Sequence, residues 1–215
     1  NWSNFFITGI GANHFTGLSA TGTGGIPNGT TLTASTLSFQ SGTPGTSGGV
    51  QKGTDQAPPI PITQSIILLS TGSPDNTSSS AIDLYLDFTG VDAGNLSFDY
   101  QTFSNALSTG ANDRSGSLRL YTSTDGITFT ELPSAAVLNF INNSPISGSK
   151  IDIALPASFN KSATARLRFY YSNGNGGTSG SRPKMSIDNL NITARATVPC
   201  LRPSAPATAL TFSNI

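Results

Sequence analysis

The sequence predicts an all-β protein folded as an antiparallel jelly-roll (Greek-key) β-sandwich. Several segments alternate strictly between apolar and polar residues, which is the pattern of half-buried strands. No window keeps a helical period for more than about two turns. The chain of 215 residues holds 23 Gly and 13 Pro, which separate the segments. The connections are too long for simple hairpins, and this spacing favours a Greek key over a meander.

The first third of the chain predicts few regular elements. The composition of residues 1–34 indicates irregular structure with an edge strand. The pattern of residues 31–40 predicts the first regular strand. Residues 41–64 are dense in Gly, Pro and Ser, so we expect a long loop there. The short apolar segment 65–71 has the composition of a strand that is buried on both faces.

Alternating strands fill the rest of the chain, and each has one apolar and one polar face. These segments are 81–88, 95–103, 116–123, 150–155, 164–172 and 185–193. In the last segment, Ile187 and Leu190 cannot share a face of a regular strand. The sequence therefore predicts a β-bulge near Asp188 and Asn189.

Residues 118–133 predict two strands joined by a two-residue turn at Asp125 and Gly126, a strong hairpin signal. The stretch resembles Ser-x-Asp-Gly-x-x-Phe turns of sialidase-type enzymes and of several sugar-binding sandwiches. The enzyme pattern usually has one more residue between Asp and Gly. A plain hairpin is therefore the better interpretation.

Charge and cysteine content exclude several classes of function. Charged residues make up 10% of the chain, with 11 basic and 11 acidic residues, so there is no basic face for nucleic acid. Cys200 has no partner for an internal disulfide or a thiolate metal cluster. The longest apolar run, within 65–70, is too short to span a membrane. We expect a mature or trimmed piece of a longer protein.

Three parts are expected along the chain. Residues 1–195 form the sandwich domain, and residues 196–207 form a Pro-rich linker. Residues 208–215 resemble the first strand of a following fibronectin type III-like domain. Alternatively, they form the last edge strand of the first domain.

Catalysis is not expected from the residues that could support it. His14 is the single histidine and lies in a glycine-rich segment, and Glu131 is the single glutamate. Asp83 and Asp87 are four residues apart on one strand, roughly 13 Å, which is too far for a glycosidase pair. The chain is therefore expected not to be an enzyme.

Four segments together carry a resemblance to a family of domains. They are residues 86–100, 114–132, 165–177 and 186–194. The chain resembles the jelly-roll domains of secreted bacterial surface proteins, of the cleaved-adhesin, MAM-like and carbohydrate-binding-module types. The resemblance implies a non-catalytic, secreted and cell-surface-associated domain that lies beside fibronectin type III-like modules.

The same resemblance implies a structural calcium ion. It points to Asp188 in the last strand as a ligand, and Asp55 is a candidate for a second carboxylate. Asp188 has an alternative role, in which it accepts turn hydrogen bonds beside its bulge.

A polar outward face is the main candidate for ligand binding, since aromatic rings offer platforms and Asp and Arg offer hydrogen bonds. Its candidates are Asp83, Tyr85, Asp87, Asp99, Arg119, Tyr121, Arg166, Arg168 and Tyr170. The alternative is cross-strand pairing among these residues. The glycine-rich loop 171–183 is a second candidate, through Asn173, Asn175 and Arg182.

The sequence thus predicts a non-catalytic domain of a secreted bacterial surface protein, for adhesion or display with glycan binding. The alternatives are an accessory carbohydrate-binding module of a secreted hydrolase and a structural stalk or filament subunit. The expected partners are glycans or cell-surface polymers and other domains of the same chain. Nucleic acid and a membrane span are not expected.

Overall fold

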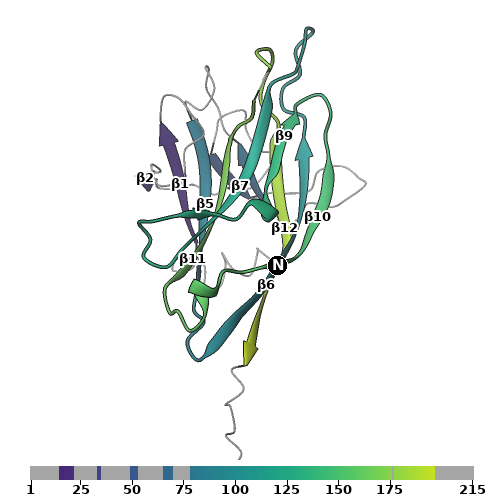
Figure 1. Cartoon of the computed structure of the whole chain (residues 1–215). Helices are drawn as coiled ribbons and strands as arrows, with labels where there is room; N and C mark the ends of the chain where they lie inside the picture. Colours follow the sequence, from purple (N-terminus) through teal and green to yellow (C-terminus); the bar gives the residue numbers. More distant parts are fainter. Residues whose placement is uncertain are drawn as a thin grey trace, which may run out of the picture.

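The computed structural model forms an antiparallel jelly-roll β-sandwich of two sheets (Figure 1). It describes residues 65–69, 80–175 and 177–196 in full, and the backbone only of strand residues 15–21, 33–34, 49–52 and 78–79. The predicted fold class is confirmed. Among the described residues there is no α-helix, and no helix has the length and apolarity that a membrane crossing requires.

The larger sheet has seven strands, in the order β2-β1-β5-β11-β7-β8, and β9 pairs with the same edge of β7 as β8. Its strands are β1 (Phe15–Thr21), β2 (Thr33–Ala34), β5 (Ser78–Leu86), β7 (Ser115–Ser123), β8 (Thr130–Glu131), β9 (Val137–Ile141) and β11 (Ala165–Asn173). β11 lies between β5 and β7, although it follows both in the sequence. Such crossovers are what distinguish a Greek key from a meander.

The smaller sheet has five strands, in the order β10-β6-β12-β4-β3. Its strands are β3 (Gly49–Lys52), β4 (Ile66–Leu69), β6 (Val91–Phe103), β10 (Ser147–Ala154) and β12 (Lys184–Ala196). Two short 3₁₀ helices, η1 (Pro133–Ala135) and η2 (Ala157–Phe159), flank β9 and β10. β12 and β6 are the longest strands and pair along most of their length.

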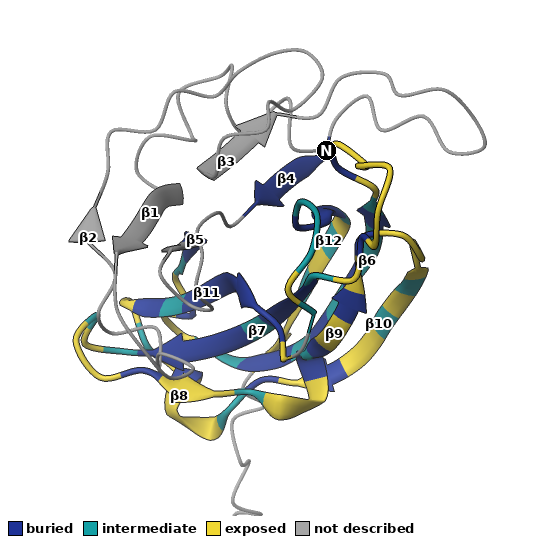
Figure 2. Ribbon diagram, turned by 90° about the horizontal axis from the view of Figure 1, so that it is seen from above, coloured by how far each residue is buried: buried dark blue, intermediate teal, exposed yellow. Residues whose placement is uncertain are grey.

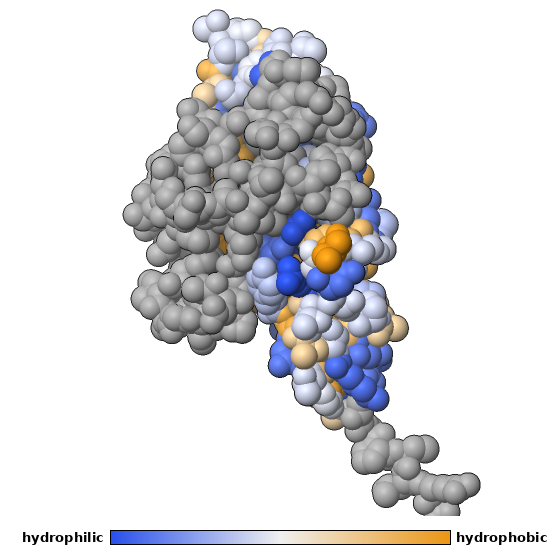
Figure 3. Space-filling view, turned by 90° about the vertical axis from the view of Figure 1, so that its left-hand side faces the viewer, coloured by the Kyte–Doolittle hydropathy of each residue, from blue (hydrophilic) through white to orange (hydrophobic). Residues whose placement is uncertain are grey.

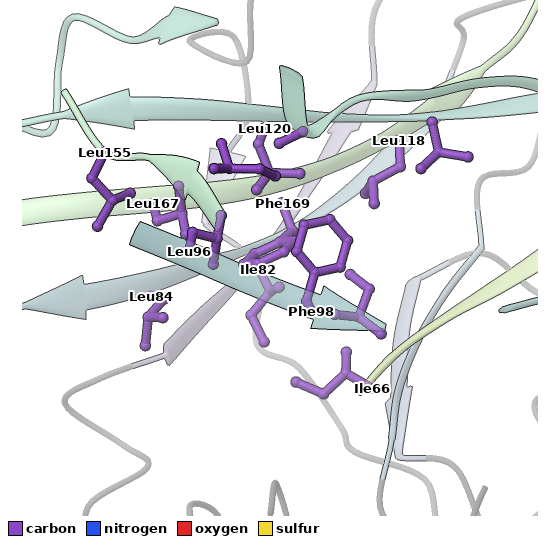
Figure 4. Packing of buried hydrophobic residues seen from close by; sticks show 14 of the residues in the cluster. Ile66, Ile82, Leu84, Leu96, Phe98, Leu118, Leu120, Leu155, Leu167 and Phe169 are labelled. Atoms are coloured by element: carbon purple, nitrogen blue, oxygen red, sulfur yellow. The ribbon is translucent and has the colours of Figure 1, made fainter. Parts of the chain in front are cut away.

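The core lies between the sheets, where the apolar faces of the alternating strands meet (Figure 4). Phe98 of β6 and Phe169 of β11 meet edge to face, with ring centroids 5.5 Å apart. Buried residues continue along β4, β7 and β11, whereas β8 and much of β10 are exposed (Figure 2). The period-two faces predicted from the sequence are therefore the faces that pack.

Several predictions for single strands are confirmed. Strand β4 is buried along its whole length, as its apolar composition predicted. The bulge in β12 is present. The register passes from the pair Asp188–Asp99 to the pair Asn191–Ser97, and Asn189 takes a positive φ of 48°. The extra residue in β12 lets both Ile187 and Leu190 pack toward the core.

Other predictions for the strands were incomplete or wrong. β1 is not an edge strand, because it pairs with β2 on one side and β5 on the other. Of residues 31–40 only Thr33–Ala34 is described as strand, and Gly49–Lys52 is a strand inside the expected loop. The sequence analysis missed β9, whose buried residues Val137 and Phe140 are three apart and do not alternate.

The turn at Asp125 and Gly126 is not a two-residue hairpin. β7 ends at Ser123 and β8 begins at Thr130, so the connection runs from Thr124 to Phe129. The Asp125 side chain causes this, because it binds backbone N–H groups that a tight hairpin would pair across the strands.

Some predictions fall outside the described residues. Asp55 and His14 lie there, as do residues 197–215, which include the end of the expected linker and the expected fibronectin-like strand. The domain boundary near residue 195 therefore stays a prediction, although β12 ends at Ala196.

Candidate functional site

The outer face of the larger sheet carries most of the predicted ligand-binding residues. Strand register sets them in rows that cross β5, β11 and β7. The rows are Asp83–Arg168–Tyr121, Tyr85–Arg166–Ser123 and Ala81–Tyr170–Arg119. Residues that are far apart in the sequence thus become direct neighbours. Figure 3 shows the molecule from the left-hand side of Figure 1, where the described residues are mainly hydrophilic.

The Asp83–Arg168 pair is buried. Asp83 is 2% and Arg168 is 5% exposed. The guanidinium donates to both carboxylate oxygens, from Nε to Oδ1 at 2.5 Å and from Nη2 to Oδ2 at 2.7 Å. The Phe129 ring covers it, with its centroid 3.8 Å from the guanidinium carbon. Such two-point pairing holds both side chains in one geometry.

Tyr121 and Tyr170 are buried beside this pair, in a small apolar cluster with Ala81 and Phe129. Their rings meet edge to face at 5.9 Å. Burial raises the pKa of the Tyr121 hydroxyl. Together with Asp83 and Arg168 these residues form a second, smaller core on the outside of the sheet. A ligand would reach them only after the covering side chains moved.

Tyr85 and Arg166 lie in the next row, and both are partly exposed. The Arg166 guanidinium carbon lies 4.7 Å from the centroid of the Tyr85 ring. It also packs against Gly126, where an added Cβ atom would lie 2.3 Å from Arg166 Nη1. Among the described residues no carboxylate pairs with Arg166. Its N–H groups therefore remain available on a fixed part of the surface.

Asp87 follows the end of β5 and is exposed. Its Oδ1 accepts the backbone N–H of Thr89 at 2.8 Å. Hydrogen bonds from the hydroxyl and the N–H of Thr89 lower the pKa of Asp87. The group is thus a fixed carboxylate two residues beyond Tyr85.

Arg119 is paired with Glu131, with 3.4 Å between Nε and Oε1. Its Nη1 atom is buried and has no hydrogen-bond partner among the residues that the structure describes. Arg119 therefore belongs to the buried part of this face and not to the part that solvent reaches.

Asp99 does not belong to this face. Its strand, β6, lies in the smaller sheet, so Asp99 points outward on the opposite side of the sandwich. The sequence analysis placed it with Asp83 because both alternate in the same way. The period of a strand shows which residues share a face of that strand, but not which sheet the strand joins.

Asp99 stands directly across from Asp188. Asp99 accepts hydrogen bonds from Ser149 Oγ at 2.5 Å and Asn189 Nδ2 at 2.7 Å, and the two bonds lower its pKa. Asp188 Oδ1 accepts the Asn189 N–H at 2.7 Å. No group of three potential metal-binding side chains exists in the described part of the chain. Calcium binding by Asp188 stays a prediction.

The loop 171–183 brings its three predicted residues to one end of the sandwich. Arg182 is buried and its Nη1 donates to the Ser115 carbonyl at 3.0 Å. Asn173 is buried as well. Asn175 is exposed, and its N–H donates to Asn139 Oδ1 at 2.8 Å. Of the three, only Asn175 presents its side chain to solvent.

The Asp125 turn carries a further feature that the sequence analysis missed. Asp125 Oδ1 accepts the N–H groups of Ile127 at 2.8 Å and Thr128 at 2.7 Å and the Ser123 hydroxyl at 2.9 Å. These bonds, led by the two backbone N–H groups, hold the pKa of Asp125 well below its usual range. Gly126 completes the turn with a φ of 73°.

A hollow of about 380 Å³ lies between this turn and the start of η2. Its lining residues are Thr122, Ser123, Thr124, Asp125, Thr128, Thr130, Pro156 and Ser158. No sequence signal links residues 156–158 with the Asp125 turn, because only the packing of the two sheets brings them together.

Comparisons with known proteins give a resemblance to solved structures only. No protein family and no curated protein matches the sequence. The chain is similar to the CBM27-1 module of Caldicellulosiruptor saccharolyticus, solved with mannohexaose, at 16% identity and a TM-score of 0.42. That match covers 66% of this chain and 80% of the module.

A second similar structure is the K3 cleaved adhesin domain of Lys-gingipain from Porphyromonas gingivalis. It is 14% identical with a TM-score of 0.33, over 61% of this chain and 74% of that domain. A third is CBM28, a module specific for non-crystalline cellulose, at 11% identity and a TM-score of 0.35, over 60% of this chain and 74% of the module. At these scores, no residue of this chain takes a role from those proteins.

Proposed function

We propose that this chain is a non-catalytic module of a secreted surface protein that binds glycans and serves adhesion or display. The proposed contact surface is the exposed part of the outer face of the larger sheet, formed by Tyr85, Asp87 and Arg166. The observation that carries the proposal is the Arg166 guanidinium, which is held over the Tyr85 ring without a carboxylate partner among the described residues.

Glycan hydroxyls both donate and accept hydrogen bonds, so a surface that binds them needs fixed groups of both kinds. Arg166 supplies donors only, and the ionised carboxylate of Asp87 supplies acceptors. Tyr85 adds a ring and a hydroxyl. Because the buried Asp83–Arg168 pair and its aromatic cover lie in the neighbouring row, the strands beneath the surface are rigid. Rigid groups lose little entropy when a ligand binds.

The carboxylates near this surface support a binding role more than a catalytic one. Asp83 is committed to Arg168, and Glu131 faces Arg119. A glycosidase needs an acid and a base or nucleophile that both face the substrate. The pKa values of Asp87 and of Asp125 in the neighbouring turn are both lowered by hydrogen bonds, so neither carboxyl supplies the acid at neutral pH.

A glycan-array screen of the 215-residue chain, with calcium and again with chelator, tests the proposal. We expect glycan binding to persist in the chelator. We expect the Arg166→Ala substitution to weaken this binding at least tenfold. Arg195→Ala is the control, because Arg195 is an exposed arginine that lies in β12 of the smaller sheet. A screen without binding in either condition would overturn the proposal and favour a spacer or stalk. Binding that occurs with calcium but is lost with chelator would instead indicate a binding site at Asp188.

A further inference from the structure

We propose that the hollow between the Asp125 turn and η2 receives a single neutral sugar residue. This inference rests on the proposed glycan binding. It adds a second binding site, distinct from the proposed contact surface, and names the class of sugar that the site would take. Six of the eight described lining residues carry a hydroxyl group: Thr122, Ser123, Thr124, Thr128, Thr130 and Ser158. The other two are Asp125 and Pro156.

Some of these polar groups are already used by the protein, and others are not. The Thr122 hydroxyl donates to the Thr130 carbonyl, and the Ser123 hydroxyl bonds with Asp125 and Gly126. The hydroxyls of Thr124, Thr130 and Ser158 have no partner in the described part of the chain, whereas the Thr128 hydroxyl bonds with the Asp125 carboxylate. These three hydroxyls are available to a ligand.

The walls of the hollow are held in place before any ligand arrives. Three hydrogen bonds hold Asp125 Oδ1. Thr164 Oγ1 donates to the Thr124 carbonyl at 2.6 Å, which ties the turn to the start of β11. On the other wall, Phe159 is fully buried and its N–H donates to the Pro156 carbonyl at 2.9 Å. A site with fixed walls retains more of its contact energy as affinity.

The lining selects a class of ligand. Among the described lining residues there is no Lys, Arg or His, and Asp125 is the charged one, so the lining disfavours anions such as uronic acids, sulfate and phosphate, although Arg166 packs against Gly126 in the same turn. Hydroxyls and a carboxylate instead match the hydroxyl groups of a neutral sugar. The volume of about 380 Å³ corresponds to about a dozen water molecules at ~30 Å³ each. A small ligand therefore fits, while a long chain would have to extend beyond the hollow.

The test is an NMR titration of the full chain with methyl glycosides of glucose, mannose and galactose, and with methyl glucuronide. We expect at least one neutral glycoside, at about 10 mM, to shift the backbone amides of Thr128, Thr130 and Ser158. Methyl glucuronide should cause no shift there. Equal shifts with the uronide would overturn the ligand class.

Two variants separate this inference from the proposed function. Ser158→Leu fills the hollow, while Ser134→Leu makes the same change at an exposed serine in the other 3₁₀ helix, outside the lining. We expect Ser158→Leu alone to weaken binding of the glycoside at least tenfold. If array glycans still bind and respond to Arg166→Ala, but no amide of the hollow shifts, glycan binding stands and the hollow is refuted. If no glycan or glycoside binds at all, both are refuted.

Discussion

Replacing Asp83 with Ala tests whether the outer face of the larger sheet is a second core. The carboxylate is almost fully buried and receives two hydrogen bonds from Arg168. Its removal leaves a guanidinium buried under Phe129 without a counter-charge. Breaking a buried ion pair in this way costs about 3–5 kcal/mol. At a urea m-value of about 2 kcal/mol/M, the unfolding midpoint should fall by about 1.5–2.5 M.

Two controls make this measurement specific. Glu131→Ala removes the carboxylate of the more exposed Arg119 pair, which should cost about 1 kcal/mol or less, or ~0.5 M in the midpoint. Adding Arg168→Met to Asp83→Ala removes the stranded charge and should restore much of the stability. If Asp83→Ala unfolds within about 0.5 M of the wild type, the pair is solvated. The whole row would then be open to ligands, as the sequence analysis expected.

Three further predictions concern a turn and the smaller sheet. Gly126→Ala should cost about 1–2 kcal/mol, since its φ is 73° and the new Cβ would meet Arg166, whereas Gly110→Ala, which has open space, should leave the melting temperature unchanged. The lowered pKa of Asp99 means that its ionised form stabilises the fold above its ordinary pKa of 3.8 and that this stability is lost as the pH falls through the folded-state pKa. Asp99→Asn should therefore flatten the fall in melting temperature between about pH 5 and 2.5, and an unchanged slope would contradict this. In chelator, Asp188→Asn should add about 0.2–1 kcal/mol to the free energy of unfolding by removing like-charge repulsion across the strands. If added calcium makes the wild type more stable than Asp188→Asn, Asp188 is a calcium ligand.

Local patterns in the sequence determined the strands and their faces. In β5, β6, β7 and β11 each side chain must lie on one of two faces, so apolar alternation alone identifies the residues of the core. The bulge in β12 was predictable for the same reason, since Ile187 and Leu190 cannot both face inward in a regular strand. β9 was not predictable, because its two buried residues do not alternate.

Only the tertiary structure decided which polar residues are exposed. Arg168 and Arg166 lie on the same face of β11, yet Phe129 covers Arg168, while Arg166 lies over the partly exposed Tyr85 ring. The separation of Asp99 from Asp83, and the meeting of Asp125 with Ser158, also come from the sheet order. These contacts join residues that are distant along the chain, and they depend on strand register and on the path of a connecting segment. A period of two residues carries no information about either.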